Sequence, residues 1–293
     1  METLLLKGKP VRDQILEKLA EQVRKAPRPP GLAVILVGLD PASAVYVSHK
    51  EKGCREVGFH HETHKLPCEA TQDEVIRLVD KLNADDTIDG ILIQLPLPAS
   101  LDQDRILLRV DPRKDVDGFH PENLGRLVAG SPRFVSCTPK GIIRLLEHYG
   151  IQLPGKKVAI VGRSVIVGRP LALLLSLKGP SGNATVTLCH SGTRDLSAIT
   201  FSSDIVIAAM GSARALGEME IAPGAVVVDV GINRIEAPDR KSGTRLVGDV
   251  NFPEVVDRVA AITPVPGGVG PMTIAMLLEN TWEAMLRNMD EGI

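Results

Sequence analysis

The sequence predicts an α/β protein built from two domains. Its 293 residues are about twice the length of an average domain, so we expect two separate cores. Short apolar runs alternate with amphipathic segments along the whole chain, which is the order typical of α/β folds. Aromatic residues make up only 3% of the chain. The sheets must therefore be built from aliphatic side chains, which suits buried parallel strands.

The first half of the chain predicts three helices and two buried strands. Each strand is a continuous apolar run, and each helix has apolar residues three and four positions apart. Asp40 or Ser43 is placed to cap the second helix, and Thr71 with Glu74 forms a capping box at the start of the third. In order, the elements are a helix over 11–23, a strand over 32–37, a helix ending at Gly58, a helix over 71–83 and a strand over 88–95.

Residues 110–138 have no clear period and are rich in turn-forming and polar residues. Long irregular stretches in compact domains usually carry function. Asp111, Asp115 and Asp117 lie close together here, but their spacing does not complete a calcium loop, so we expect a solvated turn. The histidine-rich segment 60–64 alternates like an exposed strand and does not match a zinc motif. No metal site is predicted.

The second half of the chain predicts a run of buried strands with short helices between them. Its first helix begins with Thr138 as the cap and Pro139 at the first helical position. In order, the elements are a helix over 139–149, a strand over 157–161, a helix over 170–177, strands over 184–189, 204–209 and 225–230, a short strand over 260–263 and a helix over 272–289.

Charge and cysteine content narrow the class of function. The formal net charge is −2, so the chain has no positive field to collect nucleic acid or an anionic membrane. The four cysteines form no CxxC pair, which favours a reducing compartment. The N-terminus has apolar residues before basic ones, the reverse of a signal peptide, and no apolar run is long enough to span a membrane. We expect a cytoplasmic protein that binds a small molecule and has no nucleic-acid or membrane partner.

A strand, a glycine turn and a helix with proline near its start follow one another around Gly162 and Gly168. Such a turn lets a pyrophosphate rest on free backbone N–H groups at the helix N-terminus. The two glycines are six residues apart, not in the G-x-G-x-x-G spacing, so an ordinary structural turn stays an open alternative. Small residues at 208–211 and 230–233, predicted at the same sheet edge, leave room for the other parts of a dinucleotide.

The residues after the next predicted strand favour NADP over NAD. NAD-binding units place an acidic residue there to bind the ribose 2′-hydroxyl, and this sequence has none. The hydroxyl of Ser191 and the cations Arg163 and Arg194 suit a 2′-phosphate instead. Gly192 weakens this preference, because it leaves no side chain at a position where a further cation would help.

Three further patterns suggest a catalytic site. Tyr46 and Lys50 are four residues apart, so they share one helix face and can orient a substrate and move a proton. The alternative is a surface lysine beside a tyrosine that covers the core. Gln94 ends a buried strand, where an uncharged polar side chain needs a partner or a ligand. Residues 264–273 contain three prolines and three glycines and form a stiff loop suited to lie against a flat ligand.

Five segments stand in an order that closely resembles the bifunctional methylenetetrahydrofolate dehydrogenase/methenyltetrahydrofolate cyclohydrolase family, over essentially the whole chain. They are YVSHK at 46–50, DGILIQLPLP at 89–98, KDVDG at 114–118, GRS and VGRP within 162–170, and PGGVGPMT at 266–273. The resemblance implies two α/β domains with a cleft between them, the second of Rossmann type. It assigns 1–138 plus 270–293 to a catalytic folate-binding domain and 139–269 to an NADP-binding domain that pairs into a homodimer.

The same resemblance implies the reaction. NADP⁺ would oxidise 5,10-methylenetetrahydrofolate to the 5,10-methenyl form, which water would open to 10-formyltetrahydrofolate, a part of the one-carbon metabolism that serves purine, histidine and methionine biosynthesis. Lys50 would be the main catalytic residue and carry a proton in the hydrolytic step. Gln94 would tune Lys50, Tyr46 would pack against the folate, and Asp117 would hold the pterin's N–H donors. No metal is implied.

The resemblance also assigns the binding residues. For the folate substrate they are Tyr46, Lys50, Ile93, Gln94, Leu95, Asp117, Pro264, Val265, Pro266, Gly267, Gly268, Val269, Gly270, Pro271 and Met272. For the cofactor they are Gly162, Arg163, Ser164, Ser191 and Ile232. Two alternatives stay open: an NAD(P)-dependent dehydrogenase that lacks cyclohydrolase activity, and a non-enzymatic nucleotide-binding protein of this fold. The combination of Tyr46, Lys50 and Gln94 speaks against the first, and a proton carrier speaks against the second.

Overall fold

The computed structural model describes residues 2–38, 40–238 and 243–290, and it divides into two compact units. Unit 1 consists of Met1–Arg12 and Thr138–Thr273, and unit 2 consists of Asp13–Cys137 and Ile274–Ile293. The chain passes from one unit to the other within helix α1 (Gly8–Arg24), at the start of α6 (Cys137–His148) and within α10 (Gly270–Asp290). The predicted two-domain α/β class is confirmed.

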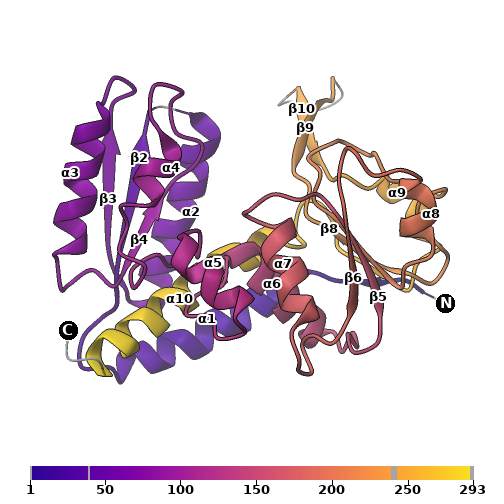
Figure 1. Ribbon diagram of the computed structural model, residues 1–293, viewed down its shortest axis with the longest axis horizontal. Helices are drawn as coiled ribbons and strands as arrows, with labels where there is room; N and C mark the ends of the chain where they lie inside the picture. The colour runs from indigo at the N-terminus through magenta and orange to yellow at the C-terminus, as the bar shows by residue number, and fades with distance from the viewer. Residues whose placement is uncertain (1, 39, 239–242, 291–293) are drawn as a thin grey trace. The chain divides into compact units, whose positions relative to one another are not determined.

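Within its described residues, unit 2 contains a parallel sheet of three strands with β2 in the centre. Alternate side chains of β2 enter two different cores. Leu32, Val34 and Leu36 pack in a cluster with α1, α2 and α10. Ala33, Ile35 and Val37 pack in a cluster with α3 and α4. Both faces of the sheet are thus covered, as a parallel sheet requires, and Figure 1 shows α2 and α3 flanking the strands. The elements are β2 (Gly31–Val37), α2 (Pro41–Val57), β3 (His60–Leu66), α3 (Gln72–Asn83), β4 (Gly90–Ile93), α4 (Gln103–Leu107) and α5 (Pro121–Val128).

The caps predicted for unit 2 form in the structure. The carboxylate of Asp40 accepts a hydrogen bond from the backbone N–H of Ser43 at 2.7 Å, which caps α2, and Gly58 ends this helix in the left-handed conformation. Thr71 and Glu74 form the complete capping box of α3. These local contacts set where α2 and α3 begin.

Unit 1 is built on a parallel sheet, whose described strands follow the order β1-β11-β8-β7-β5-β6. An antiparallel hairpin of β9 and β10 projects beyond the end of β8 (Figure 1). The strands are β1 (Leu4–Leu5), β5 (Lys157–Val161), β6 (Thr185–Cys189), β7 (Ile205–Ala208), β8 (Val226–Asp229), β9 (Asn233–Glu236), β10 (Thr244–Val247) and β11 (Ala261–Ile262). The helices are α7 (Gly168–Ser176), α8 (Leu196–Phe201) and α9 (Phe252–Val255).

The N-terminal residues differ from the predicted domain assignment. The prediction groups 1–138 in one domain, but residues 1–12 belong to unit 1, because β1 pairs with β11 in its sheet. The hydroxyl of Tyr149 adds to this attachment, since it donates to the backbone oxygen of Lys7 at 3.0 Å and accepts from its N–H at 3.1 Å. A two-residue strand has no alternation that a sequence pattern can reveal.

Three local predictions were wrong. Residues 110–138 are not irregular throughout, because α5 lies within them. Thr138 is not a cap but part of the first turn of α6, which begins at Cys137. The strand predicted over 88–95 is confined to β4, since the prolines that follow lack the N–H that would extend the ladder. No helix in the described ranges is long and apolar enough to cross a membrane.

Candidate functional site

In unit 2, Lys50 and Gln94 are joined by a direct hydrogen bond. Lys50 lies in α2, and its Nζ donates to Oε1 of Gln94 at 2.8 Å. Gln94 follows β4, where its side chain is 9% exposed and its Nε2 donates to the backbone oxygen of Leu95 at 2.8 Å. The sequence alone did not identify a partner for the buried amide of Gln94. In the structure this partner is the amine of Lys50, which was predicted to be catalytic.

The electrostatics around Lys50 favour easy proton exchange. Burial lowers the pKa of Lys50 below its ordinary value, and the negative charge of Asp117 opposes this shift. Burial also raises the pKa of Asp117, against the charge of Lys50 and a hydrogen bond with Cys137. The two shifts bring the proton affinities of the amine and the carboxyl closer together. A lysine of this kind is neutral in a larger fraction of molecules near pH 7 than a surface lysine, as a general base must be.

Tyr46 lies one turn before Lys50 on α2 and is 41% exposed. A partly exposed ring beside a proton-transfer group offers a flat surface for a ligand ring. Ile93 is buried at the end of β4, and Leu95 is partly buried. The structure thus brings together Lys50, Gln94 and Asp117, with Tyr46 one turn away along the same helix.

The turn that presents Asp117 is held by a second carboxylate, that of Asp115. This side chain is 6% exposed and accepts hydrogen bonds from the backbone N–H groups of Phe119 and His120 at 3.2 and 2.8 Å. It also accepts from Nδ2 of Asn123 at 2.8 Å. Burial raises the pKa of Asp115 to about 7. The expectation of a solvated turn is wrong, because the backbone folds its own donors around the carboxylate and removes it from water.

Lys114 is another buried charge that sequence reasoning did not interpret. Its Nζ donates to the backbone oxygens of Leu82 and Asp85, at 3.0 and 2.8 Å, at the C-terminal end of α3. A cation at this position satisfies carbonyl groups that the helix itself leaves unpaired. Its position in the segment KDVDG, close to two aspartates, could have indicated this role. A charged residue in a segment that enters the core must find polar partners.

In unit 1, the turn after β5 requires glycine at both predicted positions. Gly162 has a φ of +128°, and a Cβ there would lie 2.0 Å from the backbone oxygen of Ala209. A Cβ on Gly168 would lie 1.9 Å from the backbone oxygen of Gly162. The hydroxyl of Ser164 accepts from the backbone N–H of Val167 at 3.1 Å just before α7 begins. The turn is therefore closely packed and leads directly into a helix N-terminus, as phosphate binding requires.

The carboxyl ends of β5 and β6 expose the residues predicted to bind the cofactor. Arg163, Ser164, Ser191 and Arg194 are all exposed, and they follow two strands that are neighbours in the sheet. The backbone N–H of Gly192 donates to Nδ1 of the His190 side chain at 3.1 Å. Residues 190–194 contain no carboxylate and one arginine, so this loop is polar and positively charged.

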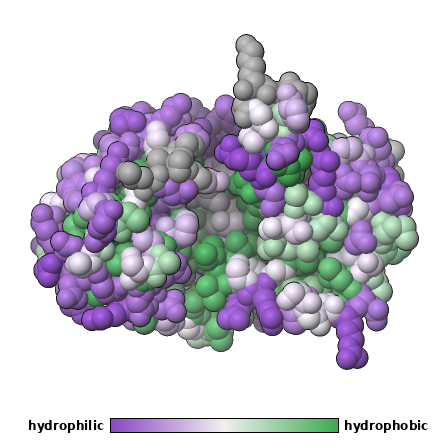
Figure 2. Space-filling model, turned by 90° about the horizontal axis from the view of Figure 1, so that it is seen from above, coloured by the Kyte–Doolittle hydropathy of each residue, from purple (hydrophilic) through white to green (hydrophobic). Residues whose placement is uncertain are grey.

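Apolar side chains are exposed along the same edge. Val165 and Ile166 follow β5, Met210 follows β7, and Ile232 follows β8, with exposed fractions of 37–49%. On the right of Figure 2, where unit 1 lies, green hydrophobic residues are interspersed with purple ones on the face drawn. Exposed apolar groups next to polar loops at the carboxyl edge of a parallel sheet are typical of a site for a ring-bearing ligand.

Two buried carboxylates tie the loops of this edge together. Asp249 accepts hydrogen bonds from the three backbone N–H groups of 210–212 at 2.7–2.9 Å and from Nδ2 of Asn233 at 2.8 Å. Asp229 accepts hydrogen bonds from the backbone N–H groups of Gly231, Asp249 and Val250 at 2.9–3.0 Å. Burial raises the pKa of Asp229 to about 6. The ends of β7 and β8 are therefore fixed to the turn that precedes α9.

The proline- and glycine-rich residues 264–272 belong to unit 1. Gly267 has a φ of +110°, a conformation that favours glycine. A Cβ on Gly268 would lie 2.7 Å from the Cβ of Thr263, so there is no room for a side chain at this position. Val269 and Met272 are buried. The segment is a rigid, closely packed loop, as its composition predicted.

Comparison with known proteins finds one family over both units. The model described as tetrahydrofolate dehydrogenase/cyclohydrolase, catalytic domain, matches residues 6–117, and the NAD(P)-binding domain model of the same name matches 136–289. The bifunctional protein FolD of Chlamydia felis (strain Fe/C-56) is 51% identical over 282 residues, which are 96% of this chain and 98% of that protein.

Two solved structures agree with this result. The bifunctional enzyme FolD, methylenetetrahydrofolate dehydrogenase/cyclohydrolase, from Campylobacter jejuni is 46% identical, with a TM-score of 0.91 and coverage of 98% of this chain and 99% of that one. The Trypanosoma brucei methylenetetrahydrofolate dehydrogenase-cyclohydrolase, solved with NADP cofactor and an inhibitor, is 38% identical, with a TM-score of 0.92 and coverage of 99% of both chains.

Proposed function

Because the chain belongs to the tetrahydrofolate dehydrogenase/cyclohydrolase family, we propose that it catalyses two consecutive reactions on one folate substrate. 5,10-Methylenetetrahydrofolate would be oxidised to the 5,10-methenyl cation, with NADP⁺ as the hydride acceptor, and water would open this cation to 10-formyltetrahydrofolate. The observation that supports the proposal most directly is the 2.8 Å hydrogen bond between Lys50 and Gln94, next to the charge of Asp117. A protein that only binds nucleotide has no need of an amine whose pKa is lowered in this way.

In the hydrolytic step, Lys50 is the proton carrier. Neutral Lys50 takes a proton from water as the water oxygen bonds to the methenyl carbon. That proton then passes to the pterin ring nitrogen as its bond to this carbon breaks. The hydroxyl group on the carbon gives its own proton to the again neutral amine as the formyl carbonyl forms on the other nitrogen, so one proton is released to solvent overall. Gln94 holds the amine in place and stabilises its protonated form through the amide oxygen. One lysine therefore serves as base and then as acid.

The remaining folate contacts are assigned by residue type. Asp117 accepts hydrogen bonds from the amino and ring N–H groups of the pterin, and Tyr46 packs its exposed ring against the substrate. Ile93 and Leu95 flank Gln94 and supply apolar contact. We also assign residues 264–272 to substrate binding, since a rigid loop without large polar side chains suits a flat ring.

The residues at the carboxyl edge of the unit 1 sheet fit a dinucleotide. When bound, NADP⁺ supplies the hydride acceptor. Gly162 and the N–H groups that open α7 bind the pyrophosphate, and Ile232 contacts the nicotinamide half. Arg163, Arg194 and Ser191 would bind the 2′-phosphate, which makes NADP the preferred cofactor despite the missing side chain at 192, and Ser164 would be a further cofactor contact.

The assembly and location follow from the same family membership. We propose that the protein is a homodimer and acts in the cytoplasm on tetrahydrofolate derivatives, without a nucleic-acid or membrane partner. The reducing conditions fit four cysteines that are free thiols in the structure. Light scattering after size-exclusion chromatography tests the dimer, and a monomer's mass would contradict it.

A direct assay tests the activity and the cofactor preference together. Purified protein is mixed with 5,10-methylenetetrahydrofolate and either NADP⁺ or NAD⁺, and the absorbance of the methenyl cation is followed. The proposal predicts formation of this cation, faster with NADP⁺, followed by its decay. If neither nucleotide produces it, the dehydrogenase proposal fails. If NAD⁺ is as effective as NADP⁺, the assignment of Arg163 and Ser191 to a 2′-phosphate fails.

A further inference from the structure

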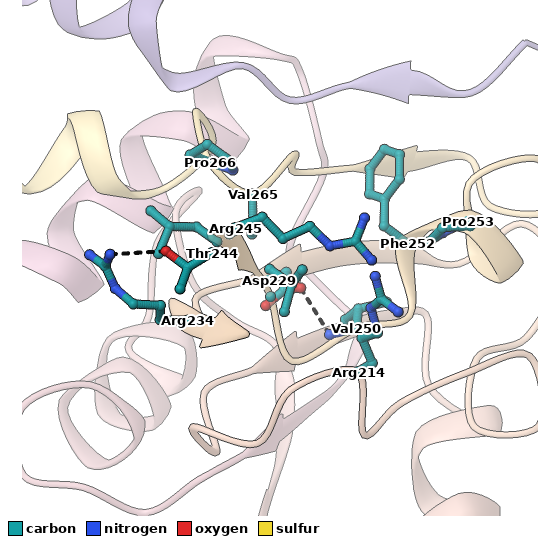
Figure 3. A pocket seen from close by; sticks show the side chains of 13 residues that line it. Arg214, Asp229, Arg234, Thr244, Arg245, Val250, Phe252, Pro253, Val265 and Pro266 are labelled. Carbon is teal, nitrogen blue, oxygen red and sulfur yellow. Dashed lines mark hydrogen bonds between the residues drawn. The ribbon is translucent and has the colours of Figure 1, made fainter. Parts of the chain in front are cut away.

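A cavity of about 530 Å³ lies in unit 1, between the β9–β10 hairpin, the turn before α9 and the start of the 264–272 loop (Figure 3). Its size is within the range of small-molecule sites. None of the residues proposed to bind NADP lines it, whereas Val265 and Pro266 belong to the loop assigned to folate binding, so the cavity adjoins the proposed substrate site. Apolar walls come from Phe252, Pro253, Val265 and Pro266.

Three arginines from different elements line this cavity. Arg214 comes from the loop after β7, Arg234 from β9 and Arg245 from β10. Arg234 donates to the hydroxyl of Thr244 at 3.3 Å, whereas Arg214 and Arg245 extend toward Phe252 in the view of Figure 3. Like charges that share a cavity repel one another unless an anion lies between them.

Arg245 has a buried hydrogen-bond donor that lacks a partner among the described residues. Its Nε is buried and has no hydrogen-bond partner among the residues that the structure describes. A guanidinium group keeps its charge at any physiological pH, so the buried N–H cannot be removed by loss of the proton. Leaving a charged donor without water and without a partner is unfavourable, and an anion in the cavity would satisfy it.

The carboxylate that lines the cavity does not neutralise the arginines. Among the described lining residues, Asp229 is the one carboxylate, and it is 3% exposed. Its two oxygens already accept three backbone hydrogen bonds, one of which, from Val250, is the dashed line beside it in Figure 3. The lining therefore keeps a net positive charge.

We propose that this cavity is a binding site for a small organic phosphate, with Arg214 and Arg245 as its anion-binding residues. The planar guanidinium group matches phosphate oxygens with two parallel hydrogen bonds, and the free Nε of Arg245 is one of the donors that such a pair uses. The apolar wall of Phe252 and Pro253 accommodates a ring or alkyl group attached to the phosphate. This site goes beyond the proposed function and does not depend on it.

Calorimetric titration of the full chain, without nucleotide and at low ionic strength, tests the proposal. The probes are inorganic phosphate and phenyl phosphate, which adds a ring. We expect saturable binding of both, tighter for phenyl phosphate. Arg245→Met and Arg214→Met should each weaken binding about tenfold or more, the effect of losing one charge-assisted hydrogen bond. Arg245→Lys, which keeps the charge but loses Nε, should lie between the wild type and Arg245→Met.

Two control variants make the result specific. Arg258→Met removes an arginine of the same unit that is paired with Glu218 outside the cavity, and it should bind phosphate like the wild type. Arg163→Met removes a proposed NADP contact, so it should leave the phosphate binding that depends on Arg214 and Arg245 unchanged and weaken only phosphate binding at the nucleotide site. Far-UV circular dichroism confirms that each variant is folded, and the exposed Arg214 keeps the test available if Arg245→Met does not fold.

The outcomes that overturn the proposal are defined by the same titrations. The proposal would be refuted if the wild type showed no saturable binding up to about 10 mM phosphate, a concentration far above the dissociation constant expected of a specific site. Equal binding by wild type and Arg214→Met would refute it as well. Loss of binding in Arg163→Met alone would show that the phosphate occupies the nucleotide site instead.

Discussion

The amine of Lys50 and the side-chain amide of Gln94 form a 2.8 Å hydrogen bond in which the lysine is the donor. An uncharged acceptor holds the lysine in place without adding a negative charge beside it. Burial can therefore keep the pKa of Lys50 below its usual value, with Asp117 as the main opposing charge. The choice of an amide at this position is what leaves the lysine able to act as a base.

Replacing the amide by a carboxylate tests this argument. In Gln94→Glu a negative charge lies within hydrogen-bond distance of the amine, so the pKa of Lys50 rises and less of it is neutral at pH 7. Each pKa unit reduces the neutral fraction about tenfold. We expect cyclohydrolase activity to fall at neutral pH and its pH profile to move to higher pH. An unchanged profile would show that the protonation state of Lys50 does not control the hydrolytic step.

Asp249→Asn should separate the two activities. The carboxylate of Asp249 holds the backbone of 210–212 and the side chain of Asn233, next to the proposed cofactor contact Ile232. An amide cannot accept all four bonds, so we expect the KM for NADP⁺ and its dissociation constant to rise about tenfold. Hydrolysis of supplied methenyltetrahydrofolate uses Lys50 in unit 2 and should be unchanged. Asp257→Asn, an exposed position of unit 1, is the control.

Equal losses of cyclohydrolase activity and NADP⁺ affinity in Asp249→Asn would contradict this division, since they would indicate a general loss of folding. Calorimetry of NADP⁺ binding gives the affinity without reference to turnover.

Asp115 should make the protein less stable as the pH rises toward neutral. Burial raises its pKa in the folded state to about 7, whereas an unfolded aspartate titrates near about 3.9. Between these values the folded state holds a proton that the unfolded state has lost, so the free energy of unfolding falls with increasing pH. One proton corresponds to a slope of at most about 1.4 kcal/mol per pH unit.

Urea denaturation of the wild type and Asp115→Asn between about pH 4 and about pH 7 measures this contribution. The variant should lose less stability over this range than the wild type. Asp104→Asn, at an exposed position of the same unit, should follow the wild type. If the free energy of unfolding changed with pH in the same way for Asp115→Asn and the wild type, Asp115 would be ionised over the whole pH range.

The ion pair of Arg28 and Asp89 should contribute more to stability than a surface pair. Two hydrogen bonds of 2.7 Å join the guanidinium group to the carboxylate, which is fully buried and also accepts from the N–H of Gly31. Arg28→Met leaves this carboxylate buried without its cation, so we expect a loss of about 3 kcal/mol. The control is Arg109→Met, which breaks an exposed pair with Asp80 and should lower the free energy of unfolding much less.

Equal effects of the two arginine substitutions in urea denaturation would contradict this view of Asp89. The buried carboxylate would then have another partner or access to water.

Local signals predicted much of the fold, because the elements concerned are specified by their own residues. The apolar run of β2 and the capping box of Thr71 and Glu74 need no information from distant parts of the chain. By contrast, β1 exists only because β11 provides a partner more than 250 residues away, and β9 and β10 pair across a turn whose tip lies outside the described residues. Their pairing depends on tertiary context rather than on alternation.

The residues of the candidate site also fall into those that a local pattern predicts and those whose role depends on the fold. The helical spacing of Tyr46 and Lys50 was visible in the sequence, but the partner of Gln94 required knowledge of how α2 lies beside β4. The role of Asp115 was missed because a cluster of aspartates is normally solvated, and only the fold shows that its carboxylate is surrounded by backbone donors. Long-range packing decides which polar residues lose water, and a single sequence does not contain that information in readable form.

The proposed division of labour between cofactor and lysine is tested most directly with Lys50→Met. Both proteins receive 5,10-methylenetetrahydrofolate and NADP⁺, and the absorbance of the methenyl cation is followed over time. For the wild type we predict a rise and then a fall, as the cation forms and is hydrolysed. For Lys50→Met we predict that the cation forms, accumulates and decays only at the rate seen without enzyme. Decay at the wild-type rate in Lys50→Met would contradict the role of Lys50 as proton carrier.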